Sequence, residues 1–155
     1  MNQADIDRMY AEIRVEKQKF DDAVAQFQAP KPAMEAELQT LKEELPRLLA
    51  GVVLGEVPKS KVQQAKRRMK EIKEFLEDFK LIEEGKGFET YEARINSKGR
   101  KVSNDERKVQ RYEALKQRFI KKPNLYYEKE LFSEAEVLGR LDEAKEFLAD
   151  LRKSK

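Results

Sequence analysis

The stretch PKSKVQQAKRRMKEIKEFLEDFKLIEE, residues 58–84, decides the fold of this chain. After Pro58 it contains no Gly or Pro, and its apolar residues recur at alternating three- and four-residue steps: Val62, Ala65, Met69, Ile72, Leu76 and Phe79. This spacing places those side chains on one side of a helix. A narrow apolar seam of this kind is typical of a coiled coil or a slim helical bundle. We therefore predict a helix over 58–84 that packs against another helix.

Three further stretches repeat the same rhythm, at 6–27, 34–52 and 137–151. Proline cannot continue the helical hydrogen-bond ladder, so Pro30 and Pro32 separate a predicted helix over 3–28 from one over 33–54. Asn2 is the expected N-cap of the first helix. Pro46 lies inside the second apolar pattern, and it predicts either a kink or two shorter helices.

The segment 88–102 allows two interpretations. Phe88, Tyr91, Ile95 and Val102 continue a helical seam, which favours a short helix, whereas Asn96-Ser97-Lys98-Gly99 resembles a turn and leaves a small hairpin as the alternative. Two capping boxes follow, at 103–106 and 133–136. Each predicts the start of a helix, one running to about residue 122 and the other to about residue 152.

Composition agrees with this pattern. Charged residues make up 41% of the 155 residues and hydrophobic residues 39%, with little Gly or Pro, which is the balance of long helices. We predict an all-α fold: about five helices in an elongated bundle of antiparallel hairpins or coiled coil. The length suits a single domain over 1–155, with 85–103 as the place where it can subdivide.

The chain lacks Cys, His and Trp. Thiol and imidazole chemistry are therefore excluded, together with disulfides and thiolate metal sites. Neighbouring acids such as Asp21-Asp22 point about 100° apart on a helix and do not converge on a substrate. The segment Gly85-Lys86-Gly87 lacks the spacing of a phosphate-binding loop. We expect no enzyme activity and no cofactor.

The first residues lack the pattern of a signal peptide, and the longest apolar run, Leu48 to Leu54, is about a third of a membrane span. We therefore expect a cytoplasmic protein without a membrane partner. Narrow seams bury little area within one subunit, so self-association or a helical protein partner is expected. The candidate assembly seam consists of Leu38, Leu41, Ile72, Leu76 and Phe79.

Positive charge is concentrated in one segment. Residues 94–122 contain eleven Lys or Arg and three acids, a net charge of +8, whereas the whole chain carries +3 and the remainder therefore −5. This segment can attract nucleic acid or dock on acidic neighbours. The candidate contacts are Lys108, Arg111 and Arg118 of this segment, together with Lys66 and Arg67 of a second basic cluster over 59–70. The alternative interpretation is that these cations are solvated or paired and that the nearby aromatic residues belong to the core.

The segment 44–56, ELPRLLAGVVLGE, followed by the charged helix Ser60 to Phe79, resembles small helical proteins encoded by phages and prophages. In those proteins a Leu-Pro-x-Leu-Leu-Ala turn, a Leu-Gly-Glu break and a charged coiled-coil arm recur. The resemblance covers about a quarter of the chain. It implies a phage-related origin, and it implies no catalytic residues. The sequence thus favours a non-enzymatic structural or protein-interaction role, with nucleic-acid binding through 94–122 as the alternative.

Overall fold

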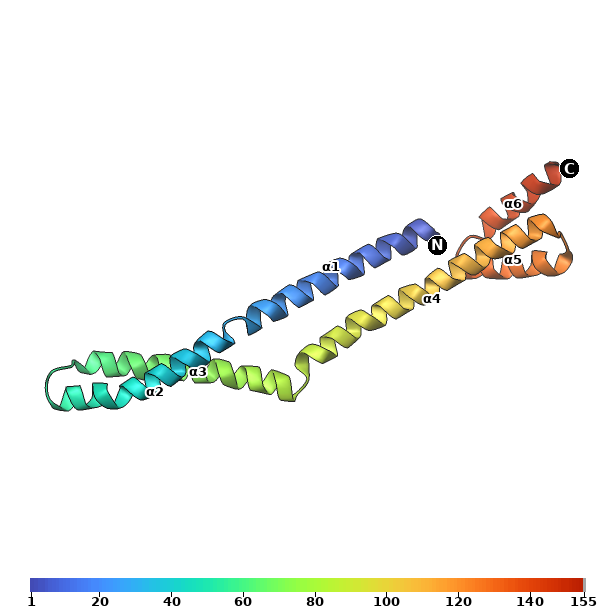
Figure 1. Ribbon diagram of the computed structural model, residues 1–155. Helices are drawn as coiled ribbons and strands as arrows, with labels where there is room; N and C mark the ends of the chain where they lie inside the picture. Colours follow the sequence, from blue (N-terminus) through green and yellow to red (C-terminus); the bar gives the residue numbers. More distant parts are fainter. Residues whose placement is uncertain (155) are drawn as a thin grey trace. The chain divides into compact units, whose positions relative to one another are not determined.

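A computed structural model describes residues 1–154 of the chain. Every regular element in this range is an α-helix, which confirms the predicted all-α class (Figure 1). There are six helices within the described range, one more than the sequence indicated. They are α1 (Gln3–Gln28), α2 (Lys31–Val53), α3 (Lys59–Glu84), α4 (Gly87–Lys121), α5 (Leu125–Val137) and α6 (Leu141–Lys153).

The helices belong to two compact units. Unit 1 contains residues 1–17 and the chain from 94 onward, and unit 2 contains residues 18–93. Helices α1 and α4 each contribute to both units. The boundary at 93–94 lies within the segment 85–103, where the sequence suggested that a single domain can subdivide.

Unit 2 is built on the α2–α3 hairpin, whose helices run side by side in Figure 1. The predicted seam of α3 is used inside this unit, because Val62, Ala65, Met69 and Ile72 are all buried. Helix α2 continues through Pro46, so the prediction of two shorter helices was wrong.

The α2–α3 turn closes on Gly51. The backbone N–H groups of Glu56 and Val57 both donate to the Gly51 carbonyl, at 2.9 and 3.2 Å. A Cβ atom at Gly51 would lie 2.5 Å from the Val57 side chain, so only glycine fits this contact. Gly55 has a φ of +74°, a left-handed conformation that glycine adopts without strain. The sequence Gly51 to Gly55 therefore specifies a tight helical hairpin.

Unit 1 has its core between α4, α5 and α6, with Ile6 of α1 added to it. Tyr112, Leu131 and Leu148 are its largest members from the last three helices, and all are buried. At the N-terminus, the Asn2 side chain accepts from the Asp5 N–H at 3.0 Å, and the Asp5 carboxylate accepts from the Asn2 N–H at 2.9 Å. The predicted N-cap at Asn2 is therefore confirmed.

The observed bounds of α4 differ from two predictions made from the sequence. The segment 88–102 is helical, so the hairpin alternative was wrong, and the helix does not restart at Ser103 but continues from Gly87 to Lys121. Ile95, Val102 and Val109 recur every seven residues and are buried. Their continuous stripe keeps the helix intact through Ser103, so the capping-box residues lie in its interior.

The prediction that a helix starts at the second capping box, 133–136, was also wrong. It lies inside α5, which begins at Leu125 after Asn124. The Asn124 side chain caps this helix by accepting from the Tyr127 N–H at 2.8 Å. The predicted helix over 133–152 is broken at Gly139, whose φ of +69° ends α5 and allows α6 to start at Leu141.

Candidate functional site

A cluster of four phenylalanine rings lies in unit 2. Phe27 of α1 stacks on Phe79 of α3 with ring centroids 5.7 Å apart, and it also contacts Phe75 at 5.3 Å. Its other neighbour is Phe88 of α4, whose ring meets it edge-on at 5.8 Å. Such ring pairs stabilise by more than their buried area alone. The cluster therefore joins parts of three helices.

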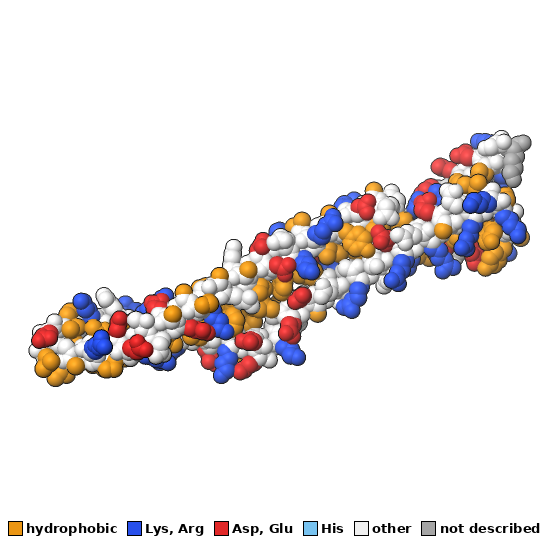
Figure 2. Space-filling view, in the orientation of Figure 1, with side chains coloured by type: hydrophobic (Ala, Val, Ile, Leu, Met, Phe, Trp, Pro, Cys, Tyr) orange, Lys and Arg blue, Asp and Glu red, His pale blue; other side chains and the backbone are white. Residues whose placement is uncertain are grey.

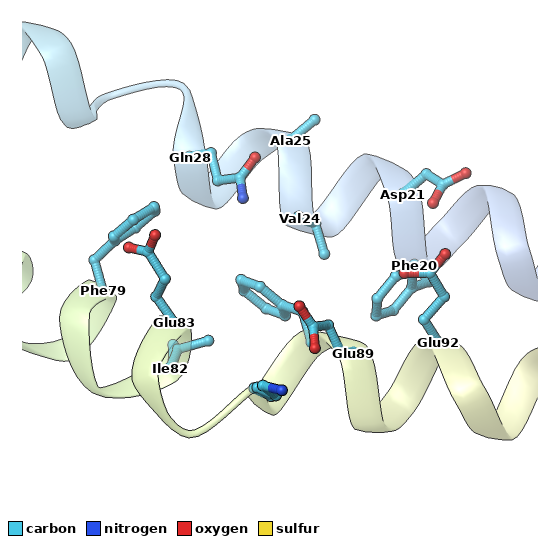
Figure 3. Close-up of a pocket in the computed structure, with 12 residues that line it drawn as sticks. Phe20, Asp21, Val24, Ala25, Gln28, Phe79, Ile82, Glu83, Glu89 and Glu92 are labelled. Carbon is cyan, nitrogen blue, oxygen red and sulfur yellow. The ribbon is translucent and has the colours of Figure 1, made fainter.

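Beside this cluster is an open cavity of about 420 Å³. Its apolar wall is formed by Phe20 and Val24 of α1, Phe79 and Ile82 of α3, and Phe88 of α4. Figure 3 shows Phe20 and Val24 projecting from α1 toward the ribbons of the other two helices. The rings are only half-buried, so parts of their surfaces remain accessible from the cavity.

Carboxylates line the same cavity. Glu83, Glu89 and Glu92 reach back toward α1 in Figure 3, whereas Asp21 points away from the other helices. Within residues 1–154, none of these four acids forms an ion pair. Lys86 is the one cation in the lining, so the cavity has an acidic rim around an apolar wall.

The Lys86 backbone has an unusual conformation. Its φ is +52°, which places a residue with a side chain in the left-handed region directly after α3. Glycine is the usual residue at that position of a helix end. Helix α3 ends at Glu84, and α4 begins at Gly87. The left-handed position at this corner is nevertheless occupied by the lysine between them.

The ring cluster already holds one cation. The Lys31 ammonium lies 3.9 Å from the centroid of the Phe79 ring. Attraction between a cation and the negative face of an aromatic ring is favourable at this distance. The rings of unit 2 therefore accept a positively charged side chain within the chain itself.

The predicted nucleic-acid contacts are divided between the two units. Lys66 and Arg67 lie on α3 in unit 2, and Lys108, Arg111 and Arg118 lie on α4 in unit 1. All five side chains are exposed, and blue side chains are visible along α4 in Figure 2. Arg111 forms an ion pair with Glu134 of α5 at 3.1 Å. Two of the five predicted contacts therefore belong to unit 2 and three to unit 1, and one of the three is engaged by an acid of its own unit.

The predicted assembly seam lies inside the α2–α3 hairpin unit. Ile72 is fully buried, and the other four seam residues are half-buried: Leu38, Leu41, Leu76 and Phe79. Helices of the same chain therefore cover much of the seam. The predicted seam is therefore not an open strip of exposed residues.

In contrast to the covered seam, the end of the α2–α3 hairpin carries exposed apolar side chains. Leu49, Val53 and Leu54 are 42, 86 and 73% exposed. Leu49 and Val53 are four residues apart on α2 and share one helix face, and Leu54 follows directly. Orange side chains gather at this end of the hairpin in Figure 2. We call these three residues the apolar tip.

From the sequence, Leu49, Val53 and Leu54 were noted only as part of the apolar run Leu48 to Leu54, and their exposure was not predicted. The signal was available: Gly51 and Gly55 bracket a tight turn, and residues at a hairpin end have no opposite helix to cover them. The cavity was also missed. Its lining comes from three helices that are distant in sequence, so no local motif marks it.

The acids of the cavity do not converge. Among the described residues, no group of three potential ligands is close enough together to hold a metal ion. No helix in residues 1–154 has both the length and the apolar character needed to cross a membrane.

No protein-family model, curated protein or solved structure matches this chain. Functional proposals therefore rest on the geometry of the chain itself.

Proposed function

We propose that this chain is a non-enzymatic protein-interaction protein that assembles with its own copies or with another helical protein in the cytoplasm. The observation that carries this proposal is the apolar tip. Val53 and Leu54 are among the most exposed large apolar residues in the chain. Adjacent exposed apolar side chains are typical of interaction sites, because burying them on a partner removes apolar surface from water.

The contrast between the covered α2–α3 seam and the exposed apolar tip supports the same proposal. Because the α2–α3 seam is covered largely within the chain, it stabilises the hairpin and leaves little for a partner. The apolar tip makes no comparable contribution to its own unit, since its side chains face solvent. A non-enzymatic role fits the lack of Cys and His and the dispersed acids of the cavity.

The test is light scattering on the full chain across a range of concentrations. We expect an oligomer, and at high salt, where contacts between charged surfaces are screened, we expect the double variant Val53→Asp/Leu54→Asp to be a helical monomer. Both positions are exposed, so the substitutions should leave the helical content unchanged by circular dichroism. The matched control is Val137→Asp, which replaces an apolar residue of 63% exposure in unit 1. A double variant with unchanged mass would argue against the apolar tip.

A second candidate function is nucleic-acid binding. It is favoured by Lys108 and Arg118, two exposed cations of α4 that have no ion-pair partner within the described part of the chain. Fluorescence anisotropy with labelled duplex DNA and single-stranded RNA would detect this binding. The expected affinity falls steeply between low and moderate salt, because phosphate contacts release counterions. Absence of binding at low salt would eliminate this candidate.

We also propose a phage or prophage origin, which the resemblance of residues 44–56 supports. This proposal concerns the source of the chain and assigns no chemistry to it. The genes that flank the coding sequence test it directly. Neighbours that encode virion or prophage functions are expected, and a run of unrelated chromosomal genes would count against it.

A further inference from the structure

We propose that the cavity of unit 2 receives arginine side chains from α4 of a second copy of this chain. This inference rests on the proposed self-association, and it names a contact surface distinct from the apolar tip. The cavity combines accessible aromatic rings with carboxylates that lack ion-pair partners among the described residues. Its chemistry is therefore suited to a cation that also has a flat, weakly hydrated surface.

Arginine meets this requirement better than lysine or a metal ion. The guanidinium group is planar, stacks on aromatic rings and donates to carboxylates in a fork. A metal ion would need convergent oxygen ligands, which the described residues do not provide. Lys31 on the Phe79 ring, 3.9 Å from its centroid, demonstrates that the neighbouring cluster takes a cation on an aromatic ring.

The second copy supplies suitable arginines. Arg107, Arg111 and Arg118 are separated by four and seven residues on α4, so they lie within about 40° of one another around the helix. All three side chains are exposed. Within residues 1–154, Arg107 and Arg118 form no ion pair, and Arg111 has one, with Glu134. We call this set the arginine face.

Charge complementarity connects the two surfaces. The arginine face lies in the segment 94–122, which carries +8, while the rest of the chain carries −5. The cavity lining contains four acids and one lysine. Opposite potentials speed association and fix the register of a complex. A copy of this chain therefore presents both the donor and the acceptor surface of a heterologous contact, in which two different patches meet.

Cysteine cross-linking tests this contact, because the chain has no cysteine of its own. One variant carries Ala25→Cys in the cavity lining, and a second, isotopically labelled variant carries Ala114→Cys beside the arginine face. Both alanines are exposed. Mixed copies are treated with a short bis-maleimide, and mass spectrometry identifies cross-links between labelled and unlabelled chains. The matched control replaces Ala25→Cys with Ala23→Cys, an exposed position of α1 outside the cavity lining.

We expect the Ala25→Cys and Ala114→Cys pair to cross-link about tenfold faster than the control pair, and this excess should vanish at high salt. Adding Glu89→Arg and Glu92→Arg to the cavity variant should also remove it. Equal rates for both pairs, or an excess that is insensitive to salt and to these reversals, would overturn the inference.

The cross-linking result and the light-scattering result test the cavity contact and the apolar tip separately. If light scattering shows an oligomer that depends on the apolar tip and the two cross-linking rates are equal, the cavity contact alone is wrong. If the excess persists in a chain that also carries Val53→Asp and Leu54→Asp, the cavity contact stands without the apolar tip.

Discussion

The Arg68 guanidinium of α3 forms two parallel hydrogen bonds with the Glu37 carboxylate of α2. Arg68 Nε donates to Oε1 at 2.7 Å and Nη2 donates to Oε2 at 2.9 Å. A forked pair of this geometry is more specific than a single ionic contact. Within residues 1–154 it is the one ion pair between α2 and α3, and it engages Arg68 inside the hairpin.

This pair predicts a pH dependence of stability. The hydrogen bonds from Arg68 hold the pKa of Glu37 below its ordinary value of 4.5. A carboxyl group with a lowered pKa in the folded state contributes stability above its unfolded pKa, and this contribution is lost as the pH falls through the folded pKa. Glu37→Gln should therefore lower the urea midpoint at pH 7 and have a smaller effect near pH 3.

The matched control for that prediction is Glu35→Gln, an acid of the same helix whose contact with Lys31 is a longer 3.9 Å. It should change the urea midpoint little at either pH, since exposed and poorly aligned ion pairs contribute little. Equal effects of Glu37→Gln at both pH values would contradict the assigned role of the pair.

Ile72 is the most deeply buried residue of the hairpin seam. Ile72→Ala should reduce the free energy of unfolding by about 2–5 kcal/mol, because it removes buried methyl groups and leaves a cavity. Ile72→Asp should abolish the helical signal of unit 2 or the oligomer, since it buries a charge without a partner. Circular dichroism with urea titration measures both effects. A folded Ile72→Asp variant with wild-type mass and stability would contradict the packing described here.

The Tyr112 hydroxyl is buried and has no hydrogen-bond partner among the described residues. Burial raises the pKa of this phenol above its ordinary value. Tyr112→Phe should therefore be neutral or stabilising by about 1 kcal/mol, because it removes an unsatisfied polar group and keeps the ring under Arg140. Tyr112→Ala should cost about 3–5 kcal/mol.

The same residue predicts behaviour in alkali. Because the folded state favours the neutral phenol, the free energy of unfolding of the wild type should fall as the pH rises above the ordinary tyrosine pKa. The Tyr112→Phe variant has no phenol at this position, so its free energy of unfolding should fall less over the same pH range. Urea titrations at pH 7 and pH 11 test this difference. A loss of more than about 1 kcal/mol for Tyr112→Phe at pH 7 would mean that the hydroxyl makes a favourable contact.

Lys86 carries a left-handed backbone at the corner between α3 and α4. Lys86→Gly should stabilise the protein by about 0.5–1 kcal/mol, since glycine adopts this conformation without strain. Lys86→Ala keeps the strain and removes the same charge, so it is the matched control and should not stabilise by this mechanism. Thermal unfolding of both variants measures the difference, and equal melting temperatures would exclude relief of strain.

Much of the fold could be predicted from the sequence because residues of the apolar pattern, such as those of α3, are buried in the structure. The helices over 3–28 and 58–84 were predicted to within a residue of their observed bounds. The failures have a common physical cause. Capping boxes at 103–106 and 133–136 are local signals, and continuous burial of Val102, Val109, Leu131 and Ala135 through both sites keeps those helices intact.

The candidate surfaces were less predictable. The cavity depends on Phe20, Phe79 and Phe88, three residues spread over 69 positions of the chain, and no periodicity brings them together. The predicted cationic contacts were chosen by charge and by helical spacing, which cannot reveal that Arg111 is engaged by Glu134. Exposure of Val53 and Leu54 depends on where the hairpin ends, and neither residue belongs to the apolar seam predicted over 34–52.

Light scattering of the full chain and of the Val53→Asp/Leu54→Asp variant tests the central claim most directly. We predict a wild-type oligomer whose mass grows with concentration and, at high salt, a helical variant whose mass is that of one chain of 18.2 kDa. A wild-type protein that remains a helical monomer at every concentration, or a variant that assembles as the wild type does, would contradict it.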